Sequence, residues 1–557
     1  MKAKYLGLLL IIVFAGLTSC NDYMNMTPTD KTSDKLVWSN ENYANMAINY
    51  FYADISYLGS FNDYECLAGM TEGLTDEFKY SSMNYNAECY IPSEISYGGS
   101  TLTASYVDVY MGEWAYKDTW GGSTCEEIRR ANEALANLKK FGSFSKPVTT
   151  RLTAELRFFR GMYYFELMKR YHQAILYTDD LTQINTNKAL NAEAECWQFV
   201  YDDLEYAGEN LQVSTTPNGR LTSGAAYALL SRAMLYAERW NDAKTAAKKV
   251  IDMGYSLTTN YAAAFESGNS EAIFQYSYSA SDGVTHSFDG FYAPGGDKTT
   301  DGNAMTGGFA TPTQDMVEEY ELAAGGKPDW SKWHSTSGVT DTPPYNQLEP
   351  RFAATILYNG SSWKNRTIEP FVGGTDGWAT WKTDATPNGK TTTGYYLRKY
   401  VDESHHFTVR QASSHCWIAF RLAEVYLNYA EACYKTNDAP TAVTYVNKVR
   451  TRVGLPGIGD LKGDNLMAAI RHERKVELAY EGLYYWDMRR WGLSPTAFTG
   501  IRRHGLKIEK NLDNSFTYTY VNVDTEDLNY PAKMNRFPLP QEEINNNNQV
   551  SQFTEWK

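Results

Sequence analysis

Paired carboxylates late in the chain are the residues best placed for catalysis. Glu473 and Glu477 are four residues apart, one turn of a helix, and Glu481 and Asp487 follow closely. A glycoside hydrolase needs only two carboxylates at a suitable separation. Basic residues accompany all four, however: Arg471, Arg474, Arg489 and Arg490. This pattern is typical of a structural ion-pair network, so we expect these carboxylates to stabilise packed helices rather than to catalyse.

Motifs of other enzyme classes are missing from the sequence. It has no G-x-S-x-G, no G-x-x-x-x-G-K and no C-x-x-C. His472-Glu473 begins a metalloprotease-like pattern, but Val476 stands where the second histidine would bind zinc. The histidines His405, His406 and His415 are not at helical ligand spacing. We therefore expect no catalytic residue, no metal site and no cofactor.

Aromatic residues in irregular sequence suggest a different chemistry, the binding of sugars. A sugar ring has an apolar face that stacks on an indole or phenol and a hydroxyl edge that suits a nearby polar side chain. Each ring could instead be buried packing, which is the favoured interpretation for Trp120 because a helix begins near it. Trp378 and Trp381 are weaker candidates, and Trp417, Trp486 and Trp491 are expected in the core. The candidate ligand-binding residues are Trp114, Trp120, Asp289, Phe291, Tyr292, Trp330 and Trp333.

Helices must position these residues, and the hydrophobic pattern predicts many of them. Apolar residues three and four apart predict helices over Glu127–Lys140, Thr150–Tyr171, Glu193–Leu211, Ser223–Glu238 and Asn241–Met253. The last two form a short pair that resembles a tetratricopeptide hairpin. A similar pair is expected near 422–433 and 442–453, followed by a helix over about Asn465–Tyr485.

The middle of the chain lacks this periodicity. Residues 281–400 contain sixteen glycines, and five of the fourteen tryptophans lie between Trp330 and Trp381. Aromatic residues are rare in true linkers, so this stretch is expected to be a functional loop region on a helical scaffold. We divide the body into an N-terminal helical part (about 20–254), a loop-rich part (about 255–415) and a C-terminal helical part (about 416–557).

The first nineteen residues are a targeting signal rather than part of the fold. Lys2 and Lys4 precede an apolar run from Leu6 to Leu17 that is too short to span a membrane. The run ends in Leu17-Thr18-Ser19-Cys20, which resembles a bacterial lipobox whose cysteine is acylated and becomes the first residue. An ordinary secreted protein and an uncleaved anchor are the alternatives. We expect a lipid anchor at Cys20 to be the membrane attachment.

Charge and cysteine content narrow the possible partners. Without the two signal lysines the chain has 50 basic and 66 acidic residues, a net charge of about −16. Nucleic acid and an anionic membrane surface are therefore poor candidate partners, because binding to them depends on clustered Lys and Arg. Six scattered cysteines remain after Cys20 and are too few for a disulfide scaffold; most are expected to be buried, and a Cys66–Cys89 bridge is possible.

Several ordered motifs give the chain a family resemblance. Arg421-Leu422-Ala423-Glu424-Val425-Tyr426-Leu427-Asn428-Tyr429-Ala430-Glu431-Ala432 is followed by Ile470-Arg471-His472-Glu473-Arg474-Lys475-Val476-Glu477-Leu478 and by Trp486-Asp487-Met488-Arg489-Arg490-Trp491-Gly492. Phe537-Pro538-Leu539-Pro540, Ile128-Arg129-Arg130-Ala131-Asn132 and Leu74-Thr75-Asp76-Glu77 match as well. With the lipobox, these motifs resemble the SusD/RagB family of outer-membrane nutrient-binding lipoproteins across essentially the whole chain. The tail lacks the family's usual N-P-G ending.

The resemblance implies a fold and a function. The implied fold is mainly α, with about four tetratricopeptide-like hairpins in a right-handed scaffold beneath an irregular ligand face, and Asp76 joins the candidate site. The implied function is capture of glycan at the cell surface, with delivery to a TonB-dependent, SusC-like outer-membrane transporter. Asp22 resembles the acidic signal for surface display. A peptide-capturing member of the family, a surface glycoside hydrolase and a protein-binding scaffold are the alternatives, and the glycan itself cannot be inferred.

Overall fold

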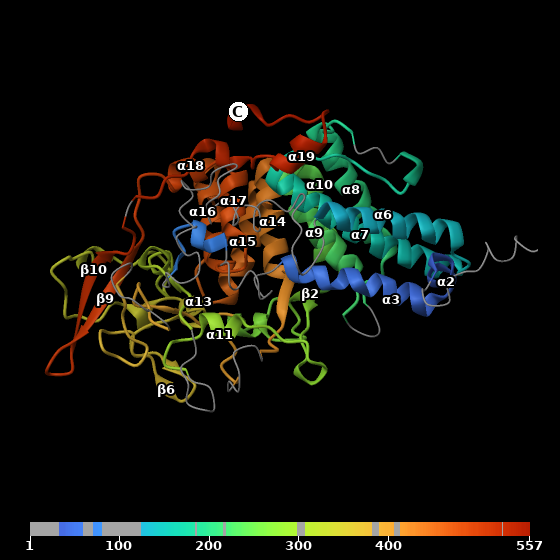
Figure 1. Ribbon diagram of the computed structural model, residues 1–557. Coiled ribbons are helices and arrows are strands. Elements are labelled where there is room, and N and C mark those ends of the chain that lie inside the picture. The colour runs from blue at the N-terminus through green and yellow to red at the C-terminus, as the bar shows by residue number, and fades with distance from the viewer. Residues whose placement is uncertain are drawn as a thin grey trace, which may run out of the picture.

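The computed structural model describes residues 33–58, 71–80, 124–183, 187–214, 219–297, 307–380, 389–405, 413–525 and 527–557. Helices dominate this part of the chain, as the sequence predicts, and pack side by side across the molecule, with an irregular region to one side of them (Figure 1). The α-helices are α2 (Asp34–Ser39), α3 (Glu41–Tyr52), α6 (Thr124–Phe141), α7 (Lys146–Tyr171), α8 (Glu193–Asn210), α9 (Ser223–Tyr236), α10 (Trp240–Ile251), α11 (Phe288–Tyr292), α12 (Gln314–Val317), α13 (Pro350–Thr355), α14 (Leu422–Lys435), α15 (Ala439–Arg452), α16 (Gly463–Glu477), α17 (Tyr484–Arg490), α18 (Ser494–Ala497) and α19 (Gln541–Asn546).

The two predicted helical pairs are confirmed, and local chemistry explains where their helices begin and end. The side chain of Thr222 accepts a hydrogen bond from the Ala225 amide at the start of α9, and Asp438 caps α15 in the same way. Glycines follow the second helix of each pair in the left-handed conformation, Gly254 at φ +91° and Gly454 at φ +82°. These are the positions where the sequence placed the helix ends.

The predicted helix over Asn465–Tyr485 is wrong in its second half. Helix α16 ends at Glu477, and α17 begins only at Tyr484. Between them Tyr480 and Gly482 adopt positive φ angles of 60° and 73°. The ring of Tyr480 is buried and stacks on Phe78 with centroids 4.3 Å apart, so tertiary packing outweighs the helical periodicity here.

The strands form two-stranded antiparallel pairs within the described chain. The pair of β2 (Ala272–Tyr276) and β8 (Trp417–Arg421) brings together the two ends of the loop-rich stretch, and β8 leads directly into α14. The remaining pairs are β1 (Phe78–Tyr80) with β3 (Ala310–Pro312), β4 (Ile356–Leu357) with β7 (Tyr396–Leu397), β5 (Ser362–Trp363) with β6 (Arg366–Thr367), and β9 (His504–Lys510) with β10 (Phe516–Asn522).

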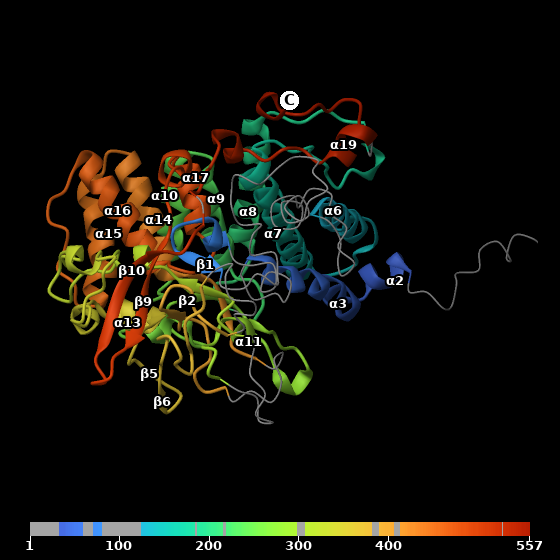
Figure 2. The same cartoon turned by 60° about the vertical axis from the view of Figure 1, so that its left-hand side comes forward.

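The β9–β10 hairpin comes from the C-terminal part of the chain but lies in the loop-rich region, beside β5, β6 and α13 (Figure 2). The Leu506 amide donates to the carbonyl of Thr393, and the Val372 amide donates to the carbonyl of Ile508, both at 2.9 Å. Leu506, Ile508, Tyr518 and Phe371 form a small apolar cluster of their own. The loop-rich region is therefore completed by a segment that the sequence division assigns elsewhere.

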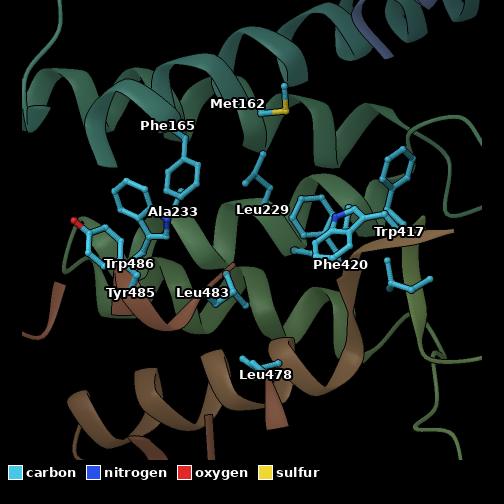
Figure 3. Packing of buried hydrophobic residues seen from close by; sticks show 14 of the residues in the cluster. Met162, Phe165, Leu229, Ala233, Trp417, Phe420, Leu478, Leu483, Tyr485 and Trp486 are labelled. Atoms are coloured by element: carbon cyan, nitrogen blue, oxygen red, sulfur yellow. The ribbon is translucent and has the colours of Figure 1, made fainter. Parts of the chain in front are cut away.

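A continuous apolar core joins the two helical parts. Figure 3 shows Phe165 of α7, Ala233 of α9 and Trp486 of α17 packed together, with Trp417 and Phe420 of β8 at the other end of the view. Trp417 and Trp486 are 2% and 4% exposed, which confirms that they are core residues. Of the cysteines that the structure describes, Cys196, Cys416 and Cys433 are buried and Cys125 is half-buried; Cys66 and Cys89 lie outside the described residues.

Candidate functional site

Buried ion pairs fasten the loop-rich region to the helices. Arg421, the last residue of β8, makes five hydrogen bonds of 2.6 to 2.8 Å to Glu271, Glu477 and Glu481. Arg351 of α13 reaches Glu473 and Glu477 on α16 at 2.6 and 3.0 Å. The prediction of an ion-pair network around these carboxylates is confirmed.

The electrostatics of this network follow from its burial. Burial alone would raise the pKa of Glu477, but Arg452, Arg421 and Arg351 together hold that pKa well below its usual range. Burial likewise opposes ionisation of Glu321, yet its hydrogen bonds with Arg450 lower the pKa to about 2. The fourth predicted carboxylate, Asp487, pairs with Arg474 and Arg490 at 2.9 and 2.7 Å. Each of these carboxylates is paired with at least one arginine.

Helix α11 carries three of the predicted ligand-binding residues, and the expectation that they are exposed is wrong. The Asp289 carboxylate is buried and accepts hydrogen bonds from the Asp402 amide (3.0 Å) and the Ser413 hydroxyl (2.6 Å), and it lies 3.1 Å from Nδ1 of His405. Burial would raise the pKa of Asp289, but these partners lower it. The carboxylate thus holds surrounding segments together rather than facing a ligand.

The two rings of α11 are also buried, with Phe291 2% and Tyr292 0% exposed. Phe291 packs edge to face on Phe309 at 5.0 Å, and Tyr292 lies against Phe288 at 4.7 Å. The sequence predicts these rings in an irregular segment of the loop-rich stretch. The segment instead forms a short helix whose rings fill the space beside β1 and β3.

Trp330 and Trp333 differ in exposure although they are neighbours. Trp330 is 5% exposed, so its predicted exposure is wrong, whereas Trp333 is half-buried. The two rings meet edge to face at 5.8 Å, and the indole nitrogen of Trp333 donates to the carbonyl of Asp341 at 3.0 Å. Trp333 therefore keeps part of its ring available at the surface.

The remaining predicted residues are either paired or outside the described chain. Asp76 is partly exposed and forms an ion pair with Lys475 of α16 at 2.8 Å. Trp114, Trp120 and Cys20 lie outside the described residues, as does Trp381, and Trp378 is half-buried.

Partly exposed rings gather around Tyr520 of β10, which lies next to the short 3-10 helix η9 (Ser331–Trp333). The ring of Tyr520 on β10 lies 4.6 Å from His334 and 4.6 Å from His504, and the His504 ring is stacked on it at 18°. Trp333 and Tyr520 pack on the same apolar cluster. We call Trp333, His334, His504 and Tyr520 the ring cluster.

Carboxylates at the start and end of α12 orient the two histidines. His334 lies 2.8 Å from Glu318 and His504 lies 2.8 Å from Asp315, which also accepts the His504 amide at 2.7 Å. Burial would lower the pKa of His504, but Asp315 and Glu318 raise it. The His334 side chain is 42% exposed and that of His504 is 24% exposed. Flat, partly exposed rings beside carboxylates suit the apolar face and hydroxyl edge of a sugar.

Sequence reasoning found Trp333 but missed the other three members of the ring cluster. A signal for Tyr520 was present, because Phe516, Tyr518 and Tyr520 alternate with threonines as a strand pattern requires. Nothing in the sequence places His334 and His504 beside this ring. In the residues that the structure covers, no group of three or more His, Cys, Asp or Glu side chains is arranged to hold a metal ion. The same residues include no helix with both the length and the apolar character needed to cross a membrane.

Comparison with protein families gives two matches. The model of the SusD family matches residues 270–556, and a model described as starch-binding associating with outer membrane matches residues 27–235. A SusD-like protein of Bacteroides ovatus is 26% identical over 371 residues, which are 63% of this chain and 60% of that protein's length. The SusD-like protein P25 of Formosa agariphila is 25% identical over 71% of this chain and 74% of its own.

Solved structures share the fold over nearly the whole chain. A SusD-like protein of Bacteroides fragilis superposes with a TM-score of 0.77 and 26% identity, covering 95% of this chain and 100% of its own. A SusD-like carbohydrate binding protein of the same species gives a TM-score of 0.73 at 22% identity, over 92% of this chain and 100% of its own. A laminarin binding SusD-like protein gives a TM-score of 0.61 at 19% identity, over 93% of this chain and 99% of its own.

Proposed function

We propose that this chain, which belongs to the SusD family, is a cell-surface protein that binds carbohydrate. It passes the carbohydrate to a TonB-dependent outer-membrane transporter. Family membership is the observation that carries the proposal. The names of two similar structures refer to carbohydrate or laminarin, and one matching family model is described as starch-binding; these words describe those proteins and that family. Lipid attachment at Cys20 and display on the cell exterior belong to the same proposal.

We place a sugar contact of this protein on the ring cluster. Trp333 and His334 leave part of their rings at the surface, and Glu318 and Asp315 lie within hydrogen-bond distance of the cluster's histidines. A pyranose stacked on these rings would keep its hydroxyl edge within reach of the carboxylates. Trp114 and Trp120 stay in the proposal as further stacking residues. We exclude the rings of α11 and Trp330 from the proposed sugar contact, because they are buried and offer no surface on which a sugar could stack.

A pair of tryptophan variants tests the placement. Trp333→Ala removes exposed stacking area worth about 1–2 kcal/mol, which should weaken glycan binding roughly 5- to 30-fold. Trp330→Ala is the matched control, because it removes the same type of side chain from a buried position. Its main effect should be a lower melting temperature rather than weaker glycan binding. Calorimetric titration with laminarin, starch and other polysaccharides, paired with thermal melts, separates the two effects.

Three results would contradict the proposal. A Trp333→Ala variant that binds glycan as wild type does would remove the ring cluster from the site. Binding of peptides but no polysaccharide would favour the peptide-capturing alternative. Release of reducing sugar from a bound polysaccharide would favour a glycoside hydrolase.

A further inference from the structure

The first two described helices carry an apolar face that the protein's core does not use. Tyr43, Met46 and Tyr50 follow one another at intervals of three and four residues along α3, so they form one stripe. Their exposed fractions are 43%, 66% and 48%, and Leu36 on α2 is 47% exposed. We call these four residues the N-terminal apolar face.

The opposite side of α3 already supplies the packing that this helix needs. Ala44, Ile48 and Phe51 are buried in the core, and Phe51 stacks on Phe159 of α7 at 5.6 Å. Tyr43, Met46 and Tyr50 are therefore additional apolar side chains rather than a displaced core stripe. A single amphipathic helix would carry polar residues at these positions.

The concentration of exposed apolar side chains on these helices is unusual within the described chain. Eight large hydrophobic residues are exposed there, and four of them belong to this face. The other four, Val213, Val284, Val372 and Leu512, are separated from one another along the chain. Single exposed apolar residues need no explanation, whereas a group of them marks an interaction surface.

The position of the face along the chain limits what can cover it. This step rests on the proposed anchor at Cys20. Residues 21–32 connect that cysteine to Ser33, and from Cys20 to Ser33 the chain can span at most roughly 45 Å when fully extended. A body of this size has a radius of gyration of about 24 Å, so its diameter exceeds the reach of the connection. Helices α2 and α3 consequently stay on the side of the body that is nearest to the lipid.

The same helices lie away from the proposed sugar contact. In both Figure 1 and Figure 2, α2 and α3 stand at the opposite side of the molecule from the β9–β10 hairpin, which carries two residues of the ring cluster. Contact of the N-terminal apolar face with a surface would leave the ring cluster open to ligand.

We propose that the N-terminal apolar face lies in the interface of the outer leaflet of the membrane, as a second attachment beside the lipid anchor. Leu36 and Met46 enter the acyl boundary, and the two tyrosines sit at the level of the headgroups, where an apolar ring with a polar tip is favoured. The hydroxyl of Tyr50 donates to Glu127 at 3.2 Å, and Arg130 bonds the same hydroxyl. These partners satisfy the polar end of Tyr50, and the Arg130 guanidinium also lies over its ring, 5.0 Å from the ring centre.

Oxidation of Met46 reports directly on this contact. The acylated full chain is bound to phosphatidylcholine vesicles, which carry no net charge, and a Cys20→Ala chain serves as the soluble reference. With dilute hydrogen peroxide, lipid contact should slow sulfoxide formation at Met46 roughly fivefold or more, because the exposed thioether becomes shielded. Met253, which is half-buried just after α10, is the internal control and should oxidise at the same rate in both samples.

A variant series tests the energetic side of the proposal. Tyr43→Ser/Met46→Ser/Tyr50→Ser should speed transfer of the acylated protein from donor to acceptor vesicles about tenfold, since it removes the second attachment. Leu512→Ser is the matched control, because it removes an exposed apolar side chain from the turn between β9 and β10 and should leave transfer unchanged.

Each outcome is decisive. Equal oxidation of Met46 on vesicles and in solution would overturn the proposal. Protection of Met46 only when the vesicles also contain a barrel transporter would assign the face to a protein partner and would equally overturn it. If the acylated full chain did not associate with vesicles at all, the anchor in the proposed function would be refuted. Comparison with the soluble reference separates this result from loss of the apolar contact alone.

Discussion

Removing Arg421 tests whether the buried ion pairs fasten the loop-rich region to the helices. Its side chain is 1% exposed and meets three carboxylates, Glu271, Glu477 and Glu481. Arg421→Ala leaves these carboxylates buried with one cation fewer. Removal of one partner from a buried ion pair costs about 3–5 kcal/mol, because the remaining charge is not compensated.

We expect the loss in free energy of unfolding to lie near the lower end of this range, because each carboxylate keeps another cation. Glu477 keeps Arg351 at 3.0 Å, Glu481 keeps Lys399 at 2.7 Å, and Glu271 keeps Arg452 at 3.1 Å. No carboxylate is therefore left without a cation. With a destabilisation of about 3 kcal/mol and a denaturant slope of about 3 kcal/mol per M, the urea midpoint should fall by about 1 M.

The control for Arg421→Ala is an exposed ion pair. Arg502 lies 2.6 Å from Asp527 with side chains 38% and 59% exposed, so Arg502→Ala should cost no more than about 1 kcal/mol. Urea unfolding followed by circular dichroism measures both variants. An Arg421→Ala midpoint no lower than that of Arg502→Ala would refute the assignment of this network as the support of the loop-rich region.

The pH dependence of the same variant gives a second readout. Glu477 has a lowered folded pKa, so its contribution to stability is present above its unfolded pKa of about 4.3 and is lost as the pH falls through the folded value. Without Arg421 the folded pKa of Glu477 is lowered less. Acid unfolding of Arg421→Ala should therefore occur at higher pH than acid unfolding of wild type.

Three further outcomes follow from the structure. Tyr292→Ala should cost about 3–5 kcal/mol of stability and melt early, because the ring is fully buried, whereas Tyr292→Phe should melt close to wild type. His504 has a raised folded pKa, so the stability that wild type gains over His504→Gln should be complete below about pH 6.5 and should shrink as the pH rises through the folded value; melts at pH 5.5 and 8.5 measure this difference. Affinity purification of the acylated protein in mild detergent should recover a TonB-dependent transporter in near-equal amount, and its repeated absence would contradict the delivery step.

The helical scaffold could be predicted because its information is local. Helices α9, α10, α14 and α15 follow apolar periodicity, and side-chain caps and left-handed glycines define several of their ends. The paired charges around Glu473 and Glu477 also indicated an ion-pair network from spacing alone. The break between α16 and α17 was missed, since it depends on the contact between Tyr480 and Phe78, which are about 400 residues apart.

The candidate site was harder to predict because exposure is a property of the folded chain. Trp330 and Trp333 are three residues apart in the same glycine-rich stretch, yet one is buried and the other is partly exposed. Phe291 and Tyr292 have the composition of a binding loop, but long-range contacts with Phe309 and Phe78 bury them. Residue type therefore indicates which rings could bind a sugar, but tertiary packing determines which of them are exposed.

The ring cluster and the two carboxylates that orient its histidines come from three segments that are separated along the chain: α12, η9 and the β9–β10 hairpin. The hairpin reaches this position from the C-terminal part of the chain, and the β2–β8 pair closes the loop-rich stretch onto the helices at its other side. The rings can thus be held in a fixed arrangement although much of the surrounding backbone is irregular. A rigid set of partly exposed rings costs little conformational entropy when it binds a flexible glycan, because the ligand alone must be ordered. Substitutions that loosen the hairpin, such as those at His504, should therefore weaken glycan binding even where they leave Trp333 untouched.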